Sequence, residues 1–375
     1  MRVVFSIRPF HRHLQPIVPL ALELSRSGHE VAIATADELG PAVVAAGVAW
    51  WPAGIHPSTA AELFPDDDAD YGIEAVSLKV TDLLEIMIGE FRPDVVVRDP
   101  TDLAPAVVAA ALKIPSGTFG FANFIPRSSW PILGGDTTMA TLRARYGLAP
   151  DPDLDTLYSG LYLSAVPPLL ESLEPLPVSR LQRVRYHTSD PEEFLPLPDR
   201  LDGLQEGPTV LVTAEAAKSH RRPLETALVA LATEGFTVIC TLKGSPDRDD
   251  LANWPESVHF VDCRLYSRIL PMSDAVIWHG GFDTMMGALS AGVPLVCLPN
   301  DSNGEYNGTR AQERGLGLLI SDDDLQPGAI AGAVHTVVRD RSFRERARAM
   351  RREVEAMPDL AEAVRSLEEF AAGSA

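Results

Sequence analysis

The sequence predicts an α/β protein made of two Rossmann-like domains, and three observations support this fold class. Apolar runs of strand length alternate with segments of helical periodicity along most of the chain. The 375 residues exceed one ordinary core and suit two domains of similar size. Residues 194–208 are rich in proline and charge and separate two patterned regions. We therefore expect one domain at residues 1–195 and a second at residues 206–356.

The chain opens with the pattern of a βαβ unit. Residues 3–7 form an apolar run, residues 17–24 repeat at helical spacing, and residues 31–35 predict the next strand. His13 lies between the first strand and the helix start, where the positive end of the helix dipole keeps an imidazole neutral. This position suits a general base near pH 7, although a solvent-facing loop histidine is the plainer interpretation of a single His.

The next patterns predict a helix at residues 37–47, a strand at 48–51, a polar loop at 52–71, a helix at 73–91, a strand at 95–98 and a helix at 104–113. Asp99 follows the buried strand directly. A carboxylate at a strand end either caps the turn that follows or serves a site there, and the pattern alone leaves both open.

Residues 119–148 are irregular and apolar, and include Phe121, Phe124 and Trp130. Loops at the carboxyl ends of parallel strands carry ligand contacts, so this segment suits the wall of a pocket for a flat, hydrophobic molecule. A packed lid explains the aromatic residues equally well. Residues 157–170 and 184–187 are expected to hold the last strands of the first domain.

The second half repeats the α/β pattern, with strands expected at residues 209–213, 236–241 and 258–261 and helices at 223–234, 329–340 and 342–356. Its most informative stretch is a buried strand at residues 275–278 that passes through His279, Gly280 and Gly281 into a helix ending at Gly292. Free N–H groups at such a helix start bind anions, most often phosphates. A structural turn is the alternative, because two glycines after a strand are a weak signal.

Composition and charge exclude several classes of ligand. The chain has 32 Lys and Arg residues and 52 Asp and Glu residues, for a net charge of -20. This surface repels nucleic acid and anionic lipid, so an anionic ligand must be held by local dipoles. No apolar run approaches the ~20 residues of a membrane span, and the first run is too short for a signal peptide. We expect a cytoplasmic protein without nucleic-acid partners or stable membrane insertion.

Two further features bear on disulfides and metals. Cys240, Cys263 and Cys297 lie in or beside apolar runs, and their odd number favours buried thiols over a disulfide framework. The aspartates at residues 66–68 could chelate a metal, but no His or Cys is interleaved with them. A solvated loop is the better interpretation, and we expect no metal site.

The phosphate-binding stretch carries a family resemblance. His279, Gly280, Gly281 and Thr284, followed by Gly-Val-Pro, Leu-Pro and Asn307, resemble the nucleotide-sugar signature of family-one glycosyltransferases of the GT-B fold. The resemblance is closest to the bacterial natural-product, or antibiotic, branch, and extends over most of the chain. It implies that the His and the Thr of this stretch hold the donor diphosphate.

The resemblance also assigns roles in the first domain. His-x-x-Pro from His13, followed by Leu-x-x-x-Gly-His-x-Val, resembles the family's first loop, in which this His is the catalytic base. Asp99 matches the carboxylate that pairs with the base, which would fix the imidazole tautomer and stabilise the imidazolium. The family usually has Gly before the base, and this chain has Arg12. The resemblance also implies that residues 357–375 form a closing helix on the first domain.

Departures from the family pattern bear on the donor. Members that use uridine donors commonly carry Glu eight residues after the phosphate-binding His, where this chain has Gly287. The Asp-Gln pair that holds glucose hydroxyls is here Asn303 and Gly304, and Thr213 lies where the family contacts the donor. A site without these groups has no partners for the hydroxyls of a ribose or of glucose. It therefore suits a thymidine-diphosphate deoxysugar, which lacks such hydroxyls and buries none of them unpaired.

Together these features predict an inverting glycosyltransferase, with the acceptor in the first domain, the donor in the second and a cleft between them. We expect no metal and no cofactor besides the nucleoside diphosphate sugar as co-substrate, and a hydrophobic, aromatic or polyketide acceptor. A homodimer is compatible with the sequence. The alternatives are a uridine-diphosphate-sugar glucosyltransferase of small aglycones, an epimerase of the same fold, for which no second base is evident, and a non-catalytic binding partner.

Overall fold

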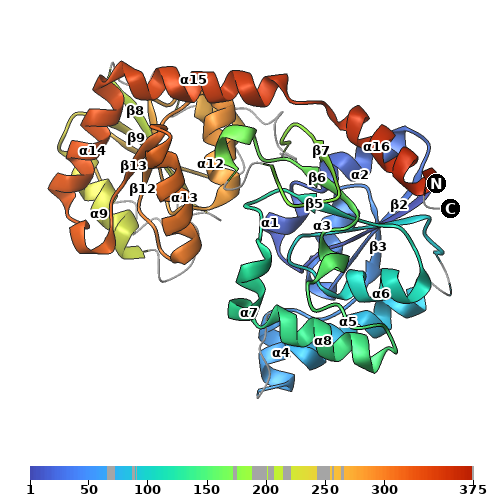
Figure 1. Cartoon of the computed structure of the whole chain (residues 1–375). Coiled ribbons are helices and arrows are strands. Elements are labelled where there is room, and N and C mark those ends of the chain that lie inside the picture. Colours follow the sequence, from blue (N-terminus) through green and yellow to red (C-terminus); the bar gives the residue numbers. More distant parts are fainter. Residues whose placement is uncertain are drawn as a thin grey trace. The chain divides into compact units, whose positions relative to one another are not determined.

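The computed structural model describes residues 1–65, 72–86, 89, 91–171, 175–187, 201, 207–213, 221–242, 254–255, 257–262 and 266–373, apart from the side chains of residues 221, 222, 224, 242, 262, 266 and 267. The chain forms two compact units, one of Met1–Ser189 with Met357–Ala375 and one of Asp190–Ala356 (Figure 1). Each unit is a Rossmann-like α/β fold, as the sequence predicts. The aspartates at 66–68, Cys263 and most of the expected boundary at 194–208 lie outside the described residues.

The first unit is built on a parallel sheet whose described strands have the order β3-β2-β1-β4-β5-β6-β7. Its strands are β1 (Arg2–Ser6), β2 (Glu30–Thr35), β3 (Ala49–Pro52), β4 (Val95–Arg98), β5 (Ser116–Gly120), β6 (Leu161–Ser164) and β7 (Arg180–Arg183). The order reverses between β1 and β4, because the chain returns from the edge strand β3 to the centre. The carboxyl ends of β1 and β4 therefore form the switch point at which open α/β sheets bind ligands.

Helices cover this sheet, and the core lies between them and the strands. They are α1 (His11–Leu14), α2 (Val18–Arg26), α3 (Gly40–Ala45), α4 (Pro57–Leu63), α5 (Ile73–Glu85), α6 (Ala104–Leu112), α7 (Trp130–Leu133), α8 (Gly135–Arg145) and α16 (Leu360–Gly373). Val4 of β1 and Val96 of β4 are fully buried, in one cluster with Leu83 of α5 and Val107 of α6. Burial of such side chains stabilises the unit by roughly 1.5–3 kcal/mol each.

Three segments fold differently from the sequence-based expectation. Residues 52–71 contain α4, and residues 119–148 contain α8, so neither segment is wholly irregular. The apolar periodicity of α8 is weak, because only Met139 and Leu142 supply large apolar side chains to its buried face. The last strand is β7 rather than residues 184–187, because this polar edge strand lacks the apolar run that marks a central strand.

The last helix, α16, packs within the first unit against α2, the edge strand β7 and its neighbour β6. Arg180 of β7 forms an ion pair with Glu369 at 2.8 Å, and Ser366 Oγ donates to Gln182 Oε1 at 3.2 Å. The backbone N–H of Arg185 also donates to the carbonyl oxygen of Pro358 at 2.6 Å. The C-terminal segment thus completes the unit that contains the N-terminus.

The second unit has a parallel sheet whose described strands have the order β10-β9-β8-β11-β12-β13. Its strands are β8 (Thr209–Thr213), β9 (Thr237–Leu242), β10 (Val258–Asp262), β11 (Ala275–Trp278), β12 (Leu295–Cys297) and β13 (Gly317–Leu319). Its helices are α9 (Arg221–Ala232), α11 (Tyr266–Ile269), α12 (Phe282–Ala291), α13 (Ser302–Glu313), α14 (Pro327–Arg339) and α15 (Arg341–Ala356). The order reverses between β8 and β11, so their carboxyl ends form a second switch point.

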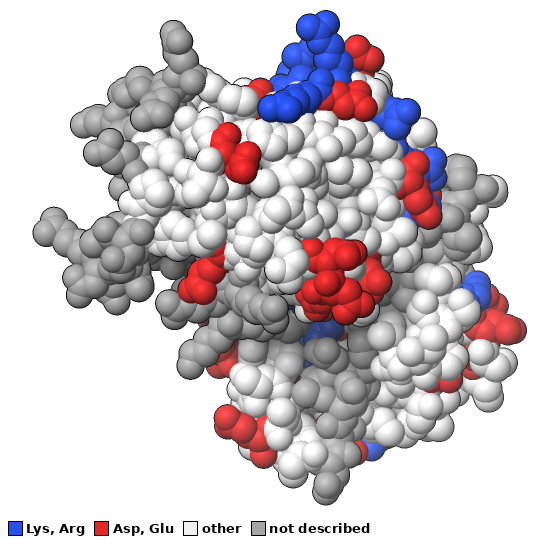
Figure 2. Space-filling model, turned by 90° about the vertical axis from the view of Figure 1, so that its left-hand side faces the viewer, with Lys and Arg blue, Asp and Glu red and all other residues white. Residues whose placement is uncertain are grey.

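Charge is distributed in local groups. Figure 2 shows one face on which Asp and Glu side chains form several clusters, while Lys and Arg side chains form small separate groups. None of the described helices is long and apolar enough to cross a membrane.

Candidate active site

His13 and Asp99 meet at the switch point of the first sheet. His13 lies in α1, after β1, and Asp99 follows β4 directly, so the pairing of these two strands brings the side chains together. Both residues are buried, and His13 Nδ1 contacts Asp99 Oδ2. A carboxylate at Nδ1 holds the proton there and leaves Nε2 as the atom that can accept one.

Other groups hold the Asp99 carboxylate in place. The backbone N–H of Arg8 donates to Oδ2 at 3.2 Å, while the backbone N–H and the hydroxyl of Thr101 donate to Oδ1 at 2.6 and 2.7 Å. Burial alone would raise the pKa of Asp99, but the contact with His13 and the bonds from Thr101 outweigh it and hold this pKa well below its usual range. Asp99 therefore stays ionised beside the imidazole.

Aromatic rings surround the imidazole. The ring of Phe121 lies edge-on to that of His13 at 5.4 Å between centroids, and the ring of Phe10 lies 5.5 Å away. The guanidinium of Arg12 stacks on Phe10 at 4.5 Å from the ring centroid. Arg12 is exposed on α1, so its side chain is compatible with the contact between His13 and Asp99.

The other two predicted pocket residues lie deeper in the first unit. Phe124 packs against the rings of Tyr158 and Tyr162, with centroids 5.7 and 5.6 Å away. Trp130 is 1 % exposed, and its Nε1–H donates to the Tyr158 hydroxyl at 2.7 Å. This placement favours the packed-lid interpretation for Phe124 and Trp130, whereas Phe121 contacts the imidazole of His13.

The second site is the loop between β11 and α12. Gly280 has φ +100°, which an L side chain rarely adopts, and a Cβ there would lie 2.1 Å from Gly304 Cα. The fully buried side chain of Asn307 donates from Nδ2 to the carbonyl oxygen of Gly280 at 2.7 Å. Trp278 Nε1 donates to the carbonyl oxygen of Gly281 at 3.1 Å. These contacts hold the loop so that its N–H groups and the start of α12 remain together.

His279, Thr284 and Gly287 lie around the start of α12. Gly281 is the residue before the helix, and a Cβ there would lie 2.7 Å from His279 Nε2, so the imidazole lies over the helix start. Thr284 and Gly287 share the partly exposed face of α12, opposite its buried face. Thr213 ends the neighbouring strand β8 and donates from Oγ1 to the carbonyl oxygen of Ile277 at 3.4 Å. Residues 214–220 lie outside the described part of the chain.

Asn303 and Gly304 lie in the first turn of α13. Asn303 is exposed, whereas Gly304 is buried, and a Cβ on Gly304 would lie 2.5 Å from the carbonyl oxygen of His279. Asp301 caps the helix by accepting from the backbone N–H of Gly304 at 2.6 Å. Close packing thus explains Gly304 without reference to the sugar, and this position gives no information about the donor.

No group of described His, Cys, Asp or Glu residues could hold a metal ion. The two described cysteines, Cys240 and Cys297, are free and buried. Burial raises the pKa of the Cys240 thiol to about 12 and also raises that of Cys297, so neither is a ready nucleophile.

The sequence and fold of the chain are similar to those of known glycosyltransferases. Residues 225–370 match the family model "Erythromycin biosynthesis protein CIII-like, C-terminal domain". The 10-deoxymethynolide desosaminyltransferase of Streptomyces venezuelae is 26% identical, over 99% of this chain and 97% of that protein. The glycosyltransferase SnogD from Streptomyces nogalater has a solved structure with a TM-score of 0.76 and 27% identity, over 99% of both chains. The glycosyltransferase VinC, solved in complex with dTDP, has a TM-score of 0.81 and 24% identity, over 100% of both chains.

The chain has the GT-B fold and is a glycosyltransferase, similar over nearly its whole length to glycosyltransferases of antibiotic biosynthesis. This glycosyltransferase also contains site residues that sequence reasoning left without a role. Thr101, two residues after Asp99, donates to the Asp99 carboxylate, and Asn307 holds the loop between β11 and α12 through Gly280. Asn307 belongs to the signature that the sequence shows, but its partner lies 27 residues away and only the fold reveals it.

Replacing Asp99 with asparagine is expected to lower turnover of the glycosyltransferase roughly tenfold or more, and by less than the loss of His13. The imidazole remains, but an amide no longer holds its proton at Nδ1 or stabilises the imidazolium. Steady-state rates with a nucleotide sugar and an acceptor measure the effect. Wild-type turnover of Asp99→Asn would assign Asp99 to capping of the turn through Thr101.

Proposed function

We propose that this glycosyltransferase inverts the anomeric carbon of a dTDP-deoxysugar while transferring it, without a metal, to a hydrophobic natural-product acceptor. The observation that carries the proposal is the buried pair of His13 and Asp99 at the switch point of one sheet, together with a phosphate-type loop at the switch point of the other. VinC was solved with dTDP, and the similar Streptomyces venezuelae protein is named a desosaminyltransferase, which agrees with this donor class.

The proposed reaction is a single displacement. His13 Nε2 takes the proton of an acceptor hydroxyl, or of an activated carbon nucleophile, as that atom bonds to the anomeric carbon on the face opposite the diphosphate. The bond from the anomeric carbon to the diphosphate oxygen breaks, and its electron pair leaves with the diphosphate. Asp99 stabilises the imidazolium that forms.

The second unit would stabilise the leaving group. Negative charge that develops on the diphosphate meets the N–H groups and positive dipole end of α12, with His279 and Thr284 beside them. These groups supply positive potential that a divalent cation supplies in other transferases. The proposal therefore requires no metal, and activity should persist in a chelator.

Incubating the protein with a panel of dTDP and UDP sugars, and measuring release of the nucleoside diphosphate with and without phenolic acceptors, tests the proposed function. We expect release from a dTDP donor that a chelator does not suppress and that an acceptor accelerates. Nucleotide binding without release from any donor would instead indicate a non-catalytic binding partner.

Gly287 tests the choice of nucleotide. Its place on the face of α12 that also carries Thr284 leaves no carboxylate to accept a bond from a ribose hydroxyl. Gly287→Glu should therefore shift the preference toward UDP over dTDP by roughly 1–3 kcal/mol, which calorimetric competition measures. Gly287→Ala is the matched control, because it adds a side chain without an acceptor. Equal inhibition of the wild type by the two diphosphates would contradict a dTDP donor.

A further inference from the structure

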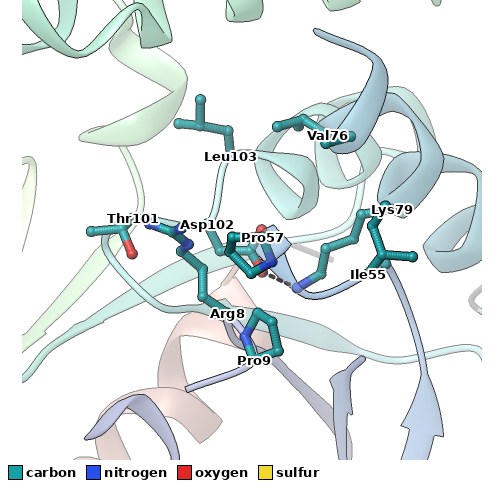
Figure 3. Close-up of a pocket in the computed structure, with 11 residues that line it drawn as sticks. Arg8, Pro9, Ile55, Pro57, Val76, Lys79, Thr101, Asp102 and Leu103 are labelled. Atoms are coloured by element: carbon teal, nitrogen blue, oxygen red, sulfur yellow. Dashed lines mark hydrogen bonds and ion pairs between the residues drawn. The ribbon is translucent and has the colours of Figure 1, made fainter. Parts of the chain in front are cut away.

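A small pocket of the first unit adjoins the pair of His13 and Asp99. It is open to solvent, with about 460 Å³ of non-atom space that includes this open part, and part of its lining is polar (Figure 3). Two of its lining residues, Arg8 and Thr101, are those whose backbone N–H groups bind the Asp99 carboxylate. The pocket therefore lies next to Asp99, the carboxylate that contacts the proposed base.

Part of the polar lining is a buried ion pair. Lys79 Nζ contacts Asp102 Oδ2 at 2.6 Å, and the two side chains are only 10% and 5% exposed (Figure 3). The Ser6 hydroxyl also donates to Asp102 Oδ2, at 2.7 Å. Burying two charges costs several kcal/mol each, and apolar replacements of such pairs are often as stable or more so. Stability alone therefore does not explain a lysine on the inner face of α5.

The bonds of the Lys79 ammonium indicate a ligand. Among the described residues it donates to two acceptors, Asp102 Oδ2 and the carbonyl oxygen of Ile7 at 2.7 Å. An ammonium has three N–H groups, so one has no acceptor within the described part of the chain. Lys79 lines the pocket together with the apolar side chains of Val76 and Leu103 (Figure 3). A bound oxygen atom would satisfy the remaining N–H.

We propose that this pocket is an acceptor subsite in which Lys79 selects acceptors that carry a carbonyl or carboxylate oxygen on the end that enters it. The inference rests on the proposed function, because it places the acceptor beside His13. Asp102 neutralises Lys79 and holds its ammonium in position, and Arg8 adds a guanidinium to the same lining. An acceptor that is apolar at this end would leave the buried N–H unsatisfied.

Three probes that share one hydroxyl and one ring system test the subsite by calorimetry: a hydroxynaphthoate, its methyl ester and the corresponding methylnaphthol. The wild type should bind the carboxylate and the ester about tenfold more tightly than the methyl compound. Arg8→Gln distinguishes a carboxylate oxygen from a carbonyl oxygen. If the bound oxygen is anionic, this variant should lower the affinity for the naphthoate and not the affinity for its ester.

The key variant is Lys79→Met with Asp102→Asn, since Lys79→Met alone leaves a buried carboxylate without its cation. We expect this double variant to unfold at a similar temperature and to bind the three probes within about twofold of one another. Lys113→Met, at an exposed lysine, should keep the wild-type preference. A double variant that keeps the preference, or a wild type that shows none, overturns the subsite. Affinity for dTDP is measured alongside, and its absence from the wild type would count against the proposed function instead.

Discussion

His13→Ala is expected to lower turnover by about two to four orders of magnitude and to leave affinity for the donor nearly intact. The variant lacks the atom proposed to take the acceptor proton, whereas the loop proposed to hold the diphosphate belongs to the other unit and keeps its contacts. Steady-state kinetics give the loss in turnover, and calorimetry with a nucleoside diphosphate gives the donor affinity.

His11 provides the matched control for this experiment. It lies in the same short helix, α1, but is exposed, and His13 rather than His11 contacts Asp99. His11→Ala should therefore keep turnover close to that of the wild type. Wild-type turnover in a correctly folded His13→Ala protein would mean that another group takes the proton.

Gly280→Ala is expected to weaken binding of nucleoside diphosphate by at least about tenfold and to lower the free energy of unfolding by roughly 1–3 kcal/mol. The new Cβ would lie 2.1 Å from Gly304 Cα, which is a backbone atom and cannot rotate away. A positive φ of 100° adds conformational strain. The loop must shift, and the N–H groups at the start of α12 then lose their common orientation.

Calorimetry with the nucleoside and its diphosphate separates the two effects. The nucleoside alone should bind nearly as before, because the N–H groups that the substitution disturbs are the proposed ligands of the phosphates. Gly332→Ala in α14 is the control, since no atom lies within 4 Å of its added Cβ, and this helical substitution should stabilise the unit by about 0.5–1 kcal/mol. Unchanged diphosphate affinity in Gly280→Ala would show that the loop is not the phosphate site.

Parts of the candidate site follow from local sequence and parts do not. The strand, glycines and helix from residue 275 to Gly292 are readable in the sequence, because strand and helix periodicity and a glycine turn are local properties. The partner of Gly280 is not readable, because Gly304 belongs to a different helix. From the sequence, the glycine at position 304 is attributed to a donor sugar that lacks hydroxyls. The structure explains the same glycine by close backbone packing against His279 and Gly280.

The pair of His13 and Asp99 shows the same division. Each residue has a plain alternative when only its neighbours are considered, as a loop histidine or as a turn cap. They are 86 positions apart, and their contact requires β1 and β4 to be adjacent. The aromatic residues of the first unit show it too. One segment of the sequence holds Phe121, Phe124 and Trp130, but the fold places Phe121 beside His13 and packs the other two against Tyr158.

The sequence by itself determined the α/β class, the turn from strand to helix at Gly280 and the residues that resemble a glycosyltransferase, because these depend on residue types at fixed spacing along the chain. Tertiary structure alone decided which groups meet at the two switch points, why position 304 is glycine and that Lys79 lines a pocket next to Asp99. The physical reason is that these contacts depend on the order of strands in each sheet, and a chain-local pattern does not encode that order.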